Sequence, residues 1–457
     1  MSTIAAISTA TGNGGIGIVR MSGKKCFEIL DKIFVPFNKE NTEIKGYSIK
    51  FGYIVNPETN EKIDEVLVSY FVAPKSYTTE NMCEINSHGG YIVEKKILQM
   101  CLKYGAEIAE AGEFTKRAFL NGRIDLAQAE SVIDLINSKS DNEAKASINQ
   151  LEGKLSKKVT EIRDTLLDVM ADIEANIDYP EYDIEEVTNT KILKVLEVVK
   201  AELIKLKDTF EDGKILKEGV KTIILGKPNA GKSSLLNTIL REERAIVSEY
   251  AGTTRDTIEE FVNIKGVPLK LIDTAGIRKT EDKIEEIGVN RAISLSKDAD
   301  LIIAIFDASK ELDEEDYKIL DIIKGKKSII LLNKKDLGDI HLESSDIIKA
   351  LNSTILKISA KNEEGIEELY ECIAEMFKTN EISMNDGVII TNIRHKNQIE
   401  KAIESANNSI ESINNCLPID IVSIPIKQIL NDLSAITGED VSEDIINEIF
   451  SKFCLGK

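Results

Sequence analysis

The sequence predicts a multidomain protein with an α+β domain at the N-terminus, an all-α helical domain, and an α/β domain with a mainly parallel sheet inserted into the helical one. The chain has 457 residues, enough for about three domains at roughly 100–200 residues each. Helical periodicity occurs on both sides of a segment in which strands and helices alternate. We therefore expect domains at 1–120, at 121–214 together with 380–457, and at 215–379.

The first domain mixes short apolar runs with turn signals. The runs Ile16–Val19, Tyr47–Val55 and Val66–Val72 predict strands, and His88-Gly89-Gly90 predicts a turn. The segment Tyr91–Tyr104 predicts a helix. This mixture is typical of an α+β domain.

Apolar residues at helical spacing characterise the second domain. In Ile148–Ile177 they recur three and four positions apart over about 30 residues, which predicts one long amphipathic helix that ends at Asp178-Tyr179-Pro180. The other expected helices are Lys191–Thr209, a helix with Ile399, Ile403, Ala406, Ile410 and Ile413 on one face, Ile424–Ile436 and Ser442–Phe453.

Between these helical segments, apolar runs rich in β-branched residues alternate with helices. The expected strands are Lys221–Leu225, Pro268–Ile272, Leu301–Phe306, Ser328–Leu332 and Ile355–Ile358. Such alternation predicts a parallel sheet with crossover helices.

Composition limits the classes of function. A net charge of −20 argues against loose electrostatic binding to nucleic acid or anionic membranes, so a nucleic-acid partner needs a local basic patch or a second, basic subunit. The cysteines form no CxxC pair and the histidines are far apart, which predicts a reduced protein without a zinc site. No signal peptide is recognisable, and no apolar run approaches the roughly 20 residues of a membrane helix. We expect a cytoplasmic protein with no membrane partner.

A glycine-rich loop follows the first strand of the α/β domain. Gly226–Ser233 matches GxxxxGK[ST] and precedes a helical run, which is the required context. The glycines let backbone N–H groups surround a phosphate, and the helix N-terminus favours negative charge. Lys232 would reach the β- and γ-phosphates, and Ser233 would offer a hydroxyl to Mg²⁺. Taken alone, such a loop can arise by chance.

Four further motifs make chance improbable because they occur in the expected order at strand or loop ends. They are Thr253-Thr254, Asp273-Thr274-Ala275-Gly276, Asn333-Lys334-Lys335-Asp336 and Ser359-Ala360-Lys361. The Asp273 carboxylate would hold Mg²⁺ through water, and Thr254 is the candidate for a second Mg²⁺ hydroxyl.

The loop at Asn333–Asp336 decides the base. An ionised Asp336 only accepts hydrogen bonds, and guanine offers two adjacent donors, N1–H and the 2-amino group. Adenine presents a lone pair at N1, so such a site rejects it by roughly 10⁴-fold or more. The motifs together resemble those of translational GTPases and Ras-like proteins, which implies GTP rather than ATP.

The residue after Gly276 is Ile277, where Ras-like proteins have a glutamine that orients the attacking water. Isoleucine cannot do this, so another device must replace it. An arginine finger contributes roughly 10³–10⁵ in rate, and a monovalent cation stabilises the same developing charge. The side-chain carbonyl of Asn229 could ligate such a cation, or Asn229 could be only a permissive loop residue.

Several segments resemble the MnmE (TrmE) tRNA-modification GTPases. They are Gly112–Gly122, Ala251–Asp256, the inserted α/β domain and the tail Phe453–Lys457, which reads FCLGK. MnmE-like proteins work with the FAD enzyme MnmG, and the pair installs a carboxymethylaminomethyl-type group on C5 of the wobble uridine in certain tRNAs. The resemblance implies GTP, tRNA and an MnmG-like FAD protein as partners, a heterotetramer with that protein, and a homodimer whose G domains associate in the presence of K⁺.

The resemblance also implies roles for individual residues of the G domain. The implied K⁺ ligands are Asn229, Ser248, Tyr250 and Thr253, and the implied Mg²⁺ ligands are Ser233 and Thr254, with Asp273 acting through water. The implied catalytic residues are Lys232, Thr254 and Glu285, of which Glu285 would position or activate water through a second solvent molecule. From the residues alone, Glu285 is one of several acids typical of a solvated helix face. The expected GTP-binding residues are Asn229, Ala230, Gly231, Lys232, Ser233, Ser234, Ser248, Thr253, Thr254, Asp273, Thr274, Ala275, Gly276, Asn333, Lys334, Asp336, Ser359, Ala360 and Lys361.

The family's N-terminal domain resembles folate-dependent aminomethyl-transfer domains, which implies a one-carbon tetrahydrofolate of the 5-formyl type as a cofactor. The implied folate-binding residues are Arg20, Glu84, Arg123 and Lys457. A carboxylate suits the N–H edge of the pterin, and cations suit the glutamate tail. Arg123 stands where the family often has lysine, which keeps the charge but changes the geometry.

Cys454 in the tail has two interpretations. Lys452 and Lys457 lie close in sequence and could stabilise the thiolate that a nucleophilic or redox cysteine requires. Alternatively, it is a small residue on a tail that docks near the folate site.

Two other functions compete with tRNA modification. A regulatory GTPase of ribosome assembly often carries a KH module, but no GXXG loop occurs after residue 380. A non-catalytic scaffold is disfavoured because Lys232, Thr254 and Asp273 are intact. In a modification enzyme, GTP hydrolysis would shift the G domains between open and closed states and so gate the remote site.

Overall fold

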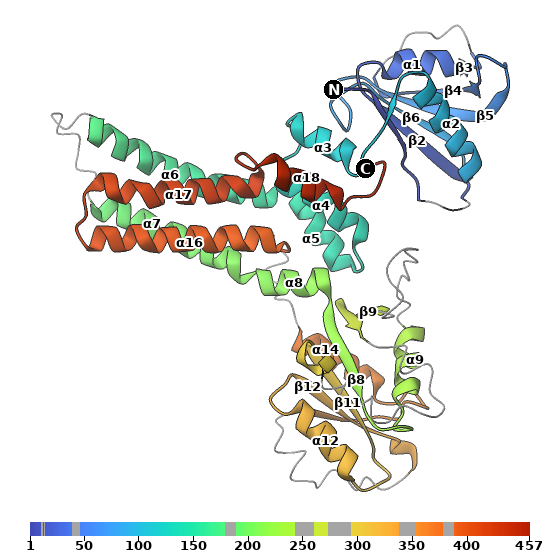
Figure 1. Ribbon diagram of the computed structural model, residues 1–457. Helices are drawn as coiled ribbons and strands as arrows, with labels where there is room; N and C mark the ends of the chain where they lie inside the picture. The colour runs from blue at the N-terminus through green and yellow to red at the C-terminus, as the bar shows by residue number, and fades with distance from the viewer. Residues whose placement is uncertain are drawn as a thin grey trace. The chain divides into compact units, whose positions relative to one another are not determined.

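The computed structural model describes residues 1–10, 12, 14–38, 46–178, 189–242, 260–272, 294–337, 353–377 and 388–457 (Figure 1). Contacts divide the chain into two compact units. The first comprises Met1–Ile133, Leu151–Thr160 and Leu430–Lys457, and the second comprises Asp134–Gln150 and Glu161–Ile429. No helix of the described residues is both long enough and apolar enough to cross a membrane.

The first unit contains a seven-stranded sheet in the order β3-β4-β5-β6-β2-β1-β7, antiparallel except for the parallel pair β1 and β7. The strands are β1 (Ile4–Ile7), β2 (Ile16–Ser22), β3 (Phe34–Pro36), β4 (Ser48–Val55), β5 (Lys62–Phe71), β6 (Met82–His88) and β7 (Glu107–Ile108). Helices α1 (Cys26–Ile33) and α2 (Tyr91–Lys103) supply Ile29, Leu30 and Ile97 to the core on one face of this sheet. The prediction of an α+β domain is confirmed.

Side chains alternate between the two faces of β2, as the pleat requires. Val19 and Met21 are fully buried in the core, whereas Arg20 between them lies on the other face. Helices α3 (Glu113–Leu120) and α18 (Glu443–Ser451) pack together through Phe119 and Phe450, whose ring centres lie 6.3 Å apart, and Phe453 after α18 joins the same apolar cluster. This packing brings the C-terminal tail to the N-terminal domain.

The predicted helix across 148–177 is two helices. After α4 (Leu126–Asn137), α5 (Asp141–Leu151) ends three residues before α6 (Lys154–Asp178) begins. Gly153 lies between them with φ of +83°, a left-handed conformation that favours glycine. The apolar spacing continues across this turn, but Ile148 is 42% exposed. The prediction of one uninterrupted helix is therefore wrong at its start.

The other predicted helices are confirmed. They are α7 (Asn189–Asp208), α16 (Ile393–Asn414), α17 (Ile419–Thr437) and α18. In the second unit, α7 and α16 lie side by side (Figure 1). Their apolar stripes, which include Leu196 and Leu203 on α7 and Ile399 and Ala406 on α16, are buried.

The second unit also contains a six-stranded sheet in the order β13-β12-β11-β8-β10-β9. The strands are β8 (Val220–Leu225), β9 (Glu260–Ile264), β10 (Val267–Leu271), β11 (Leu301–Asp307), β12 (Ser328–Asn333) and β13 (Thr354–Lys357), and the helices around them are α8 (Phe210–Glu218), α9 (Lys232–Glu242), α12 (Glu314–Ile323) and α14 (Ile366–Met376). Only the pairing of β9 with β10 is antiparallel. The prediction of a mainly parallel sheet with crossover helices is confirmed.

Candidate functional site

The glycine-rich loop joins β8 to α9 at the carboxyl end of the parallel strands. A Cβ at Gly226 would lie 2.5 Å from Ile305 Cγ2, and one at Gly231 would lie 2.0 Å from Asn333 Nδ2. Gly231 also has φ of +111°, and Asn229 has φ of +61°. Both glycines are therefore required by close approach, and the loop is held tightly against the neighbouring strand ends.

Lys232 begins α9 and turns its side chain back over the loop. Its Nζ donates hydrogen bonds to the carbonyl oxygens of Gly226, at 2.5 Å, and of Lys227, at 2.8 Å. Burial lowers the pKa of Lys232 below its ordinary value. The ammonium is thus held by main-chain oxygens at the place where the motif predicts phosphate.

The base-recognition loop after β12 is tied to the glycine-rich loop by one side chain. Asn333 Nδ2 donates to the Ala230 carbonyl at 2.7 Å, and Asn333 Oδ1 accepts from the Ala360 N–H at 2.9 Å. Ser359 Oγ donates to Asp336 Oδ1 at 2.8 Å. One buried amide therefore joins three predicted nucleotide-binding segments, and the Ser359 hydroxyl holds the carboxylate that is expected to read guanine.

Carboxylates that the sequence reasoning missed surround these loops. Lys334 Nζ lies 2.6 Å from Asp307 Oδ2, at the end of β11. Lys227 Nζ lies 2.6 Å from both Asp313 Oδ2 and Asp316 Oδ2, at the start of α12. The pattern Asp313-x-x-Asp316 resembles a helix capping box, which was the one available signal.

Part of the predicted site lies outside the described residues. These residues are Ser248, Tyr250, Thr253, Thr254, Asp273, Thr274, Ala275, Gly276 and Glu285. The predicted Mg²⁺ and K⁺ sites therefore have only Ser233 and Asn229 within the described part of the chain. Ser233 belongs to the first turn of α9, and Asn229 lies in the glycine-rich loop.

The first unit brings together the residues predicted to bind folate. Arg20 and Glu84 are register partners on β2 and β6, and Arg20 Nη2 lies 2.8 Å from Glu84 Oε1. The guanidinium carbon of Arg123 lies 4.5 Å from the centre of the Tyr77 ring, and that of Arg20 lies 5.8 Å from it. Two guanidinium groups thus lie near one aromatic ring, and a carboxylate pairs with one of them.

The C-terminal tail reaches this cluster. Arg20 Nη1 and Ser8 Oγ both donate to the Gly456 carbonyl at 3.0 Å, and the Phe114 N–H donates to the Lys457 carbonyl at 3.2 Å. Cys454 is half-buried, and its carbonyl accepts from the Gly112 N–H. The tail therefore docks beside Arg20, and both interpretations of Cys454 stay predictions.

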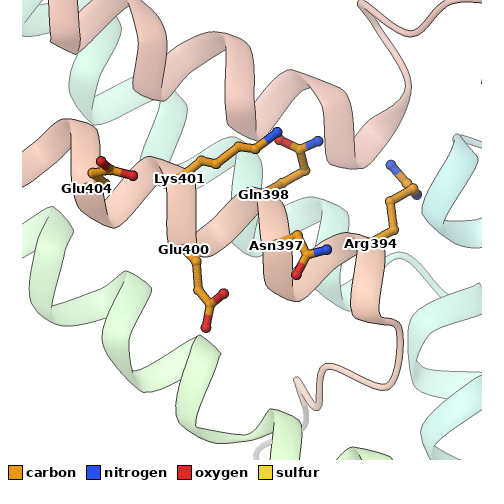
Figure 2. Close-up of a pocket in the computed structure, with 6 residues that line it drawn as sticks. All are labelled: Arg394, Asn397, Gln398, Glu400, Lys401 and Glu404. Atoms are coloured by element: carbon orange, nitrogen blue, oxygen red, sulfur yellow. The ribbon is translucent and has the colours of Figure 1, made fainter.

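Another group of polar residues lies on α16. Figure 2 shows Arg394, Asn397, Gln398, Glu400, Lys401 and Glu404 around a shallow, open pocket. All six side chains come from one helix face, and both signs of charge are interspersed. Such a face is typical of a solvated helix surface, and we assign it no function.

The parallel sheet, the phosphate loop after β8 and the linked Asn-Lys-x-Asp loop after β12 define a P-loop protein of the guanine-nucleotide-binding class. Two family models match the chain: "MnmE helical domain" over residues 126–454 and "GTP-binding protein TrmE N-terminus" over residues 3–123. The chain therefore belongs to the MnmE (TrmE) family.

Relatives match over their whole length. Proteins named tRNA modification GTPase MnmE from Acetivibrio thermocellus and Clostridioides difficile are each 50% identical, over 456 and 457 residues, and cover 100% of this chain and 99% of the relative. Among solved structures, the G domain of the T. maritima FeoB iron transporter is 28% identical, covers 34% of this chain and 97% of that chain, and superposes with a TM-score of 0.25. A score that low supports no conclusion.

Proposed function

We propose that this chain hydrolyses GTP and, with an MnmG-like FAD protein, installs a carboxymethylaminomethyl-type group on C5 of the wobble uridine in tRNA. The observation that carries the GTP assignment is the Asn333 side chain, which joins the phosphate loop to the loops that recognise the base. The substrate assignment is supported by full-length relatives named for tRNA modification.

Nucleoside mass spectrometry of total tRNA from a host that lacks this gene tests the proposal. We expect the aminomethyl-type group to be lost from wobble uridine and to return with the wild-type gene. A Lys232→Ala gene is the control for the GTPase requirement, and we expect it not to restore the group. Unchanged uridines would leave GTP binding in place and favour a regulatory GTPase of ribosome assembly.

Hydrolysis is proposed to depend on Mg²⁺ and K⁺. Ser233 opens α9 beside Lys232 and would supply one Mg²⁺ ligand, together with Thr254 and, through water, Asp273. The left-handed backbone at Asn229 sets this residue at the turn of the phosphate loop, where its side-chain oxygen would ligate K⁺ with Ser248, Tyr250 and Thr253. The cation would stabilise charge that develops on the phosphoryl oxygens, and Glu285 would position the water. Equal turnover in K⁺ and Na⁺ at matched ionic strength would refute the K⁺ site.

The cluster of Arg20, Glu84, Arg123 and Lys457 is proposed to bind a one-carbon tetrahydrofolate, which would supply the one-carbon unit. Support comes from the two guanidinium groups at the Tyr77 ring and from the Glu84 carboxylate beside Arg20. Calorimetric titration with 5-formyltetrahydrofolate should show binding that Glu84→Gln weakens. For Cys454, full tRNA modification by Cys454→Ser would exclude a catalytic thiol.

The gating of modification by the G domains is proposed to act through a homodimer and a heterotetramer with the FAD protein. The β9–β10 hairpin follows Thr254 and precedes Asp273 in the sequence, so it connects the two segments expected to sense the γ-phosphate. At its tip, the Gly266 carbonyl accepts a hydrogen bond from Asn142 of α5 at 3.3 Å. Lys139 Nζ lies 3.2 Å from the centre of the Phe261 ring on β9.

These contacts offer a route from the nucleotide to the helices. A GTP-locked variant that still modifies tRNA at the normal rate would refute the gating. The expected domain limits of 1–120, 121–214 with 380–457, and 215–379 are part of the same proposal. Limited proteolysis that cuts first inside 215–379 rather than at its ends would refute those limits.

A further inference from the structure

Each of the two predicted nucleotide loops carries a lysine whose ammonium pairs with a carboxylate. The carboxylates all belong to one segment of the chain, residues 307–316. Lys334 of the base loop pairs with Asp307, and Lys227 of the phosphate loop pairs with Asp313 and Asp316. We call Asp307, Asp313 and Asp316 the acidic brace. The brace runs from the end of β11 to the first turn of α12 (Figure 1).

On the side of the base loop, hydrogen bonds hold the Asp307 carboxylate in place. Asp307 Oδ1 accepts from the Ser309 N–H at 3.1 Å and from Ser309 Oγ at 2.6 Å, which leaves Oδ2 for Lys334. Burial by itself would raise the pKa of Asp307, but these hydrogen bonds outweigh it and hold the pKa below its ordinary value. Lys334 has φ of +69°, an uncommon backbone conformation for a lysine, and its Nζ donates to Asp307 Oδ2 at 2.6 Å.

On the side of the phosphate loop, Asp313 and Asp316 contact the loop through the Lys227 side chain. The Lys227 side chain is 18% exposed, and its partner Asp316 is 5% exposed. Asp316 is fixed in turn because it caps α12: its Oδ2 accepts from the Asp313 N–H at 3.1 Å. The Lys227 carbonyl is one of the two oxygens that hold the Lys232 ammonium, so the anchored side chain fixes the backbone that positions Lys232.

We propose that the acidic brace positions both nucleotide loops, with Asp307 acting through Lys334 on the base side and Asp313 and Asp316 acting through Lys227 on the phosphate side. This inference rests on the proposed function, because it assumes that guanine nucleotide binds between these loops. None of the three carboxylates needs to touch the nucleotide. They are positioning residues that reduce the disorder which binding would otherwise have to remove.

Fluorescence polarisation of mant-GDP with the full-length chain tests the brace. Asp307→Asn and Lys227→Met should each weaken binding about three- to tenfold, since each removes a charge-assisted bond that is partly exposed to solvent. Lys227→Met is preferred to a change at Asp316 because it leaves the cap of α12 intact. Asp321→Asn, on the exposed side of α12, is the matched control and should bind as the wild type does.

A double-mutant cycle separates positioning from a general loss of stability. If Asp307 acts through Lys334, then adding Asp307→Asn to Lys334→Met should weaken binding no further. If the fold losses of affinity of the two single variants multiply in the double variant, the proposal is overturned. Wild-type affinity in both Asp307→Asn and Lys334→Met would also overturn it. Should Asp307→Asn unfold, Asp307→Glu replaces it, and a longer carboxylate that fails to restore at least part of the affinity would also overturn the proposal. A wild-type chain that does not bind GDP would overturn the proposed function and the brace together, whereas wild-type binding with unaffected variants overturns the brace alone.

Discussion

Replacing Asn333 with alanine should destabilise the nucleotide-binding sheet more than a surface change would. The Asn333 side chain is 3% exposed, and its two partners, Ala230 and Ala360, are 2% and 4% exposed. The substitution leaves the Ala230 carbonyl and the Ala360 N–H buried without this partner. Each such group costs about 1–3 kcal/mol, so we expect a loss of about 2–6 kcal/mol for the two.

Differential scanning calorimetry is the suitable assay, because the chain has no tryptophan to report unfolding by fluorescence. The transition that added GDP moves upward identifies the unit containing the nucleotide site, since a ligand stabilises only the state that binds it. For a domain of this size, about 2–4 °C is lost per kcal/mol. The GDP-sensitive transition of Asn333→Ala should therefore fall by about 4–24 °C.

Asn362→Ala is the matched control because Asn362 is an exposed asparagine in the neighbouring loop. It should leave the GDP-sensitive transition within about 1 °C of the wild type, in keeping with the small effects of surface changes. If Asn333→Ala behaves like this control, the two hydrogen bonds do not hold the loops together, and the reasoning is wrong. If its transition falls but its GDP affinity is unchanged, the bridge serves stability and not the site.

Three further changes test other parts of the molecule. Gly456→Ala should displace the tail, because the residue has φ of +84° and a Cβ would lie 2.3 Å from the Ile7 carbonyl oxygen. We expect tRNA modification to fall while GTP hydrolysis persists. A normal nucleoside profile would contradict this expectation. Asn142→Ala should leave GTP turnover intact but lower tRNA modification, because the Gly266 carbonyl loses its donor on α5. Proportional changes in both activities would argue against a route from the β9–β10 hairpin to α5. Burial raises the pKa of Glu143 from 4.5 to about 7. Between these two pH values the folded chain keeps the Glu143 proton, whereas the unfolded chain has released it. The free energy of unfolding should therefore decline as pH rises from about 4.5 to about 7. Calorimetry of Glu143→Gln should show a smaller decline, and an identical pH dependence would remove Glu143 as its cause.

The strands of the nucleotide-binding sheet were predictable because burial dictates their composition. Leu301–Phe306 and Ser328–Leu332 lie in the middle of a parallel sheet, and both are buried along their whole length. Such strands read as continuous apolar runs, so the predicted bounds differ from the structure by one residue. The helix break at Gly153 was not predictable in the same way. Apolar residues keep helical spacing on both sides of it, and only the left-handed backbone of one glycine marks the turn.

In the candidate site, too, the residues of the sequence motifs were predictable, whereas the residues that contact them only after folding were not. The motif that includes Lys232 and the one that includes Asp336 were identifiable because phosphate and guanine each require a particular chemistry at fixed spacing. Asp307 and Asp316 were missed because a carboxylate at a strand end or in a first helical turn resembles an ordinary solvated or capping residue. Their partners are lysines from loops distant in sequence, so only the folded chain reveals the ion pairs.

The loops expected to bind nucleotide and the hairpin proposed to relay its state are held by different contacts. Asn333 joins the phosphate loop to the base loops by buried hydrogen bonds, and carboxylates fix the lysines of both, so these loops share one set of anchors. The β9–β10 hairpin is paired with β8 in the same sheet. It also meets Asn142 of α5 through one long hydrogen bond and Lys139, which precedes α5, through a cation–π contact. Weak contacts of this kind can rearrange at small cost, whereas the loop anchors cannot. The proposed gating therefore needs only the contacts of the hairpin with Asn142 and Lys139 to change, while the sheet that contains the hairpin stays fixed.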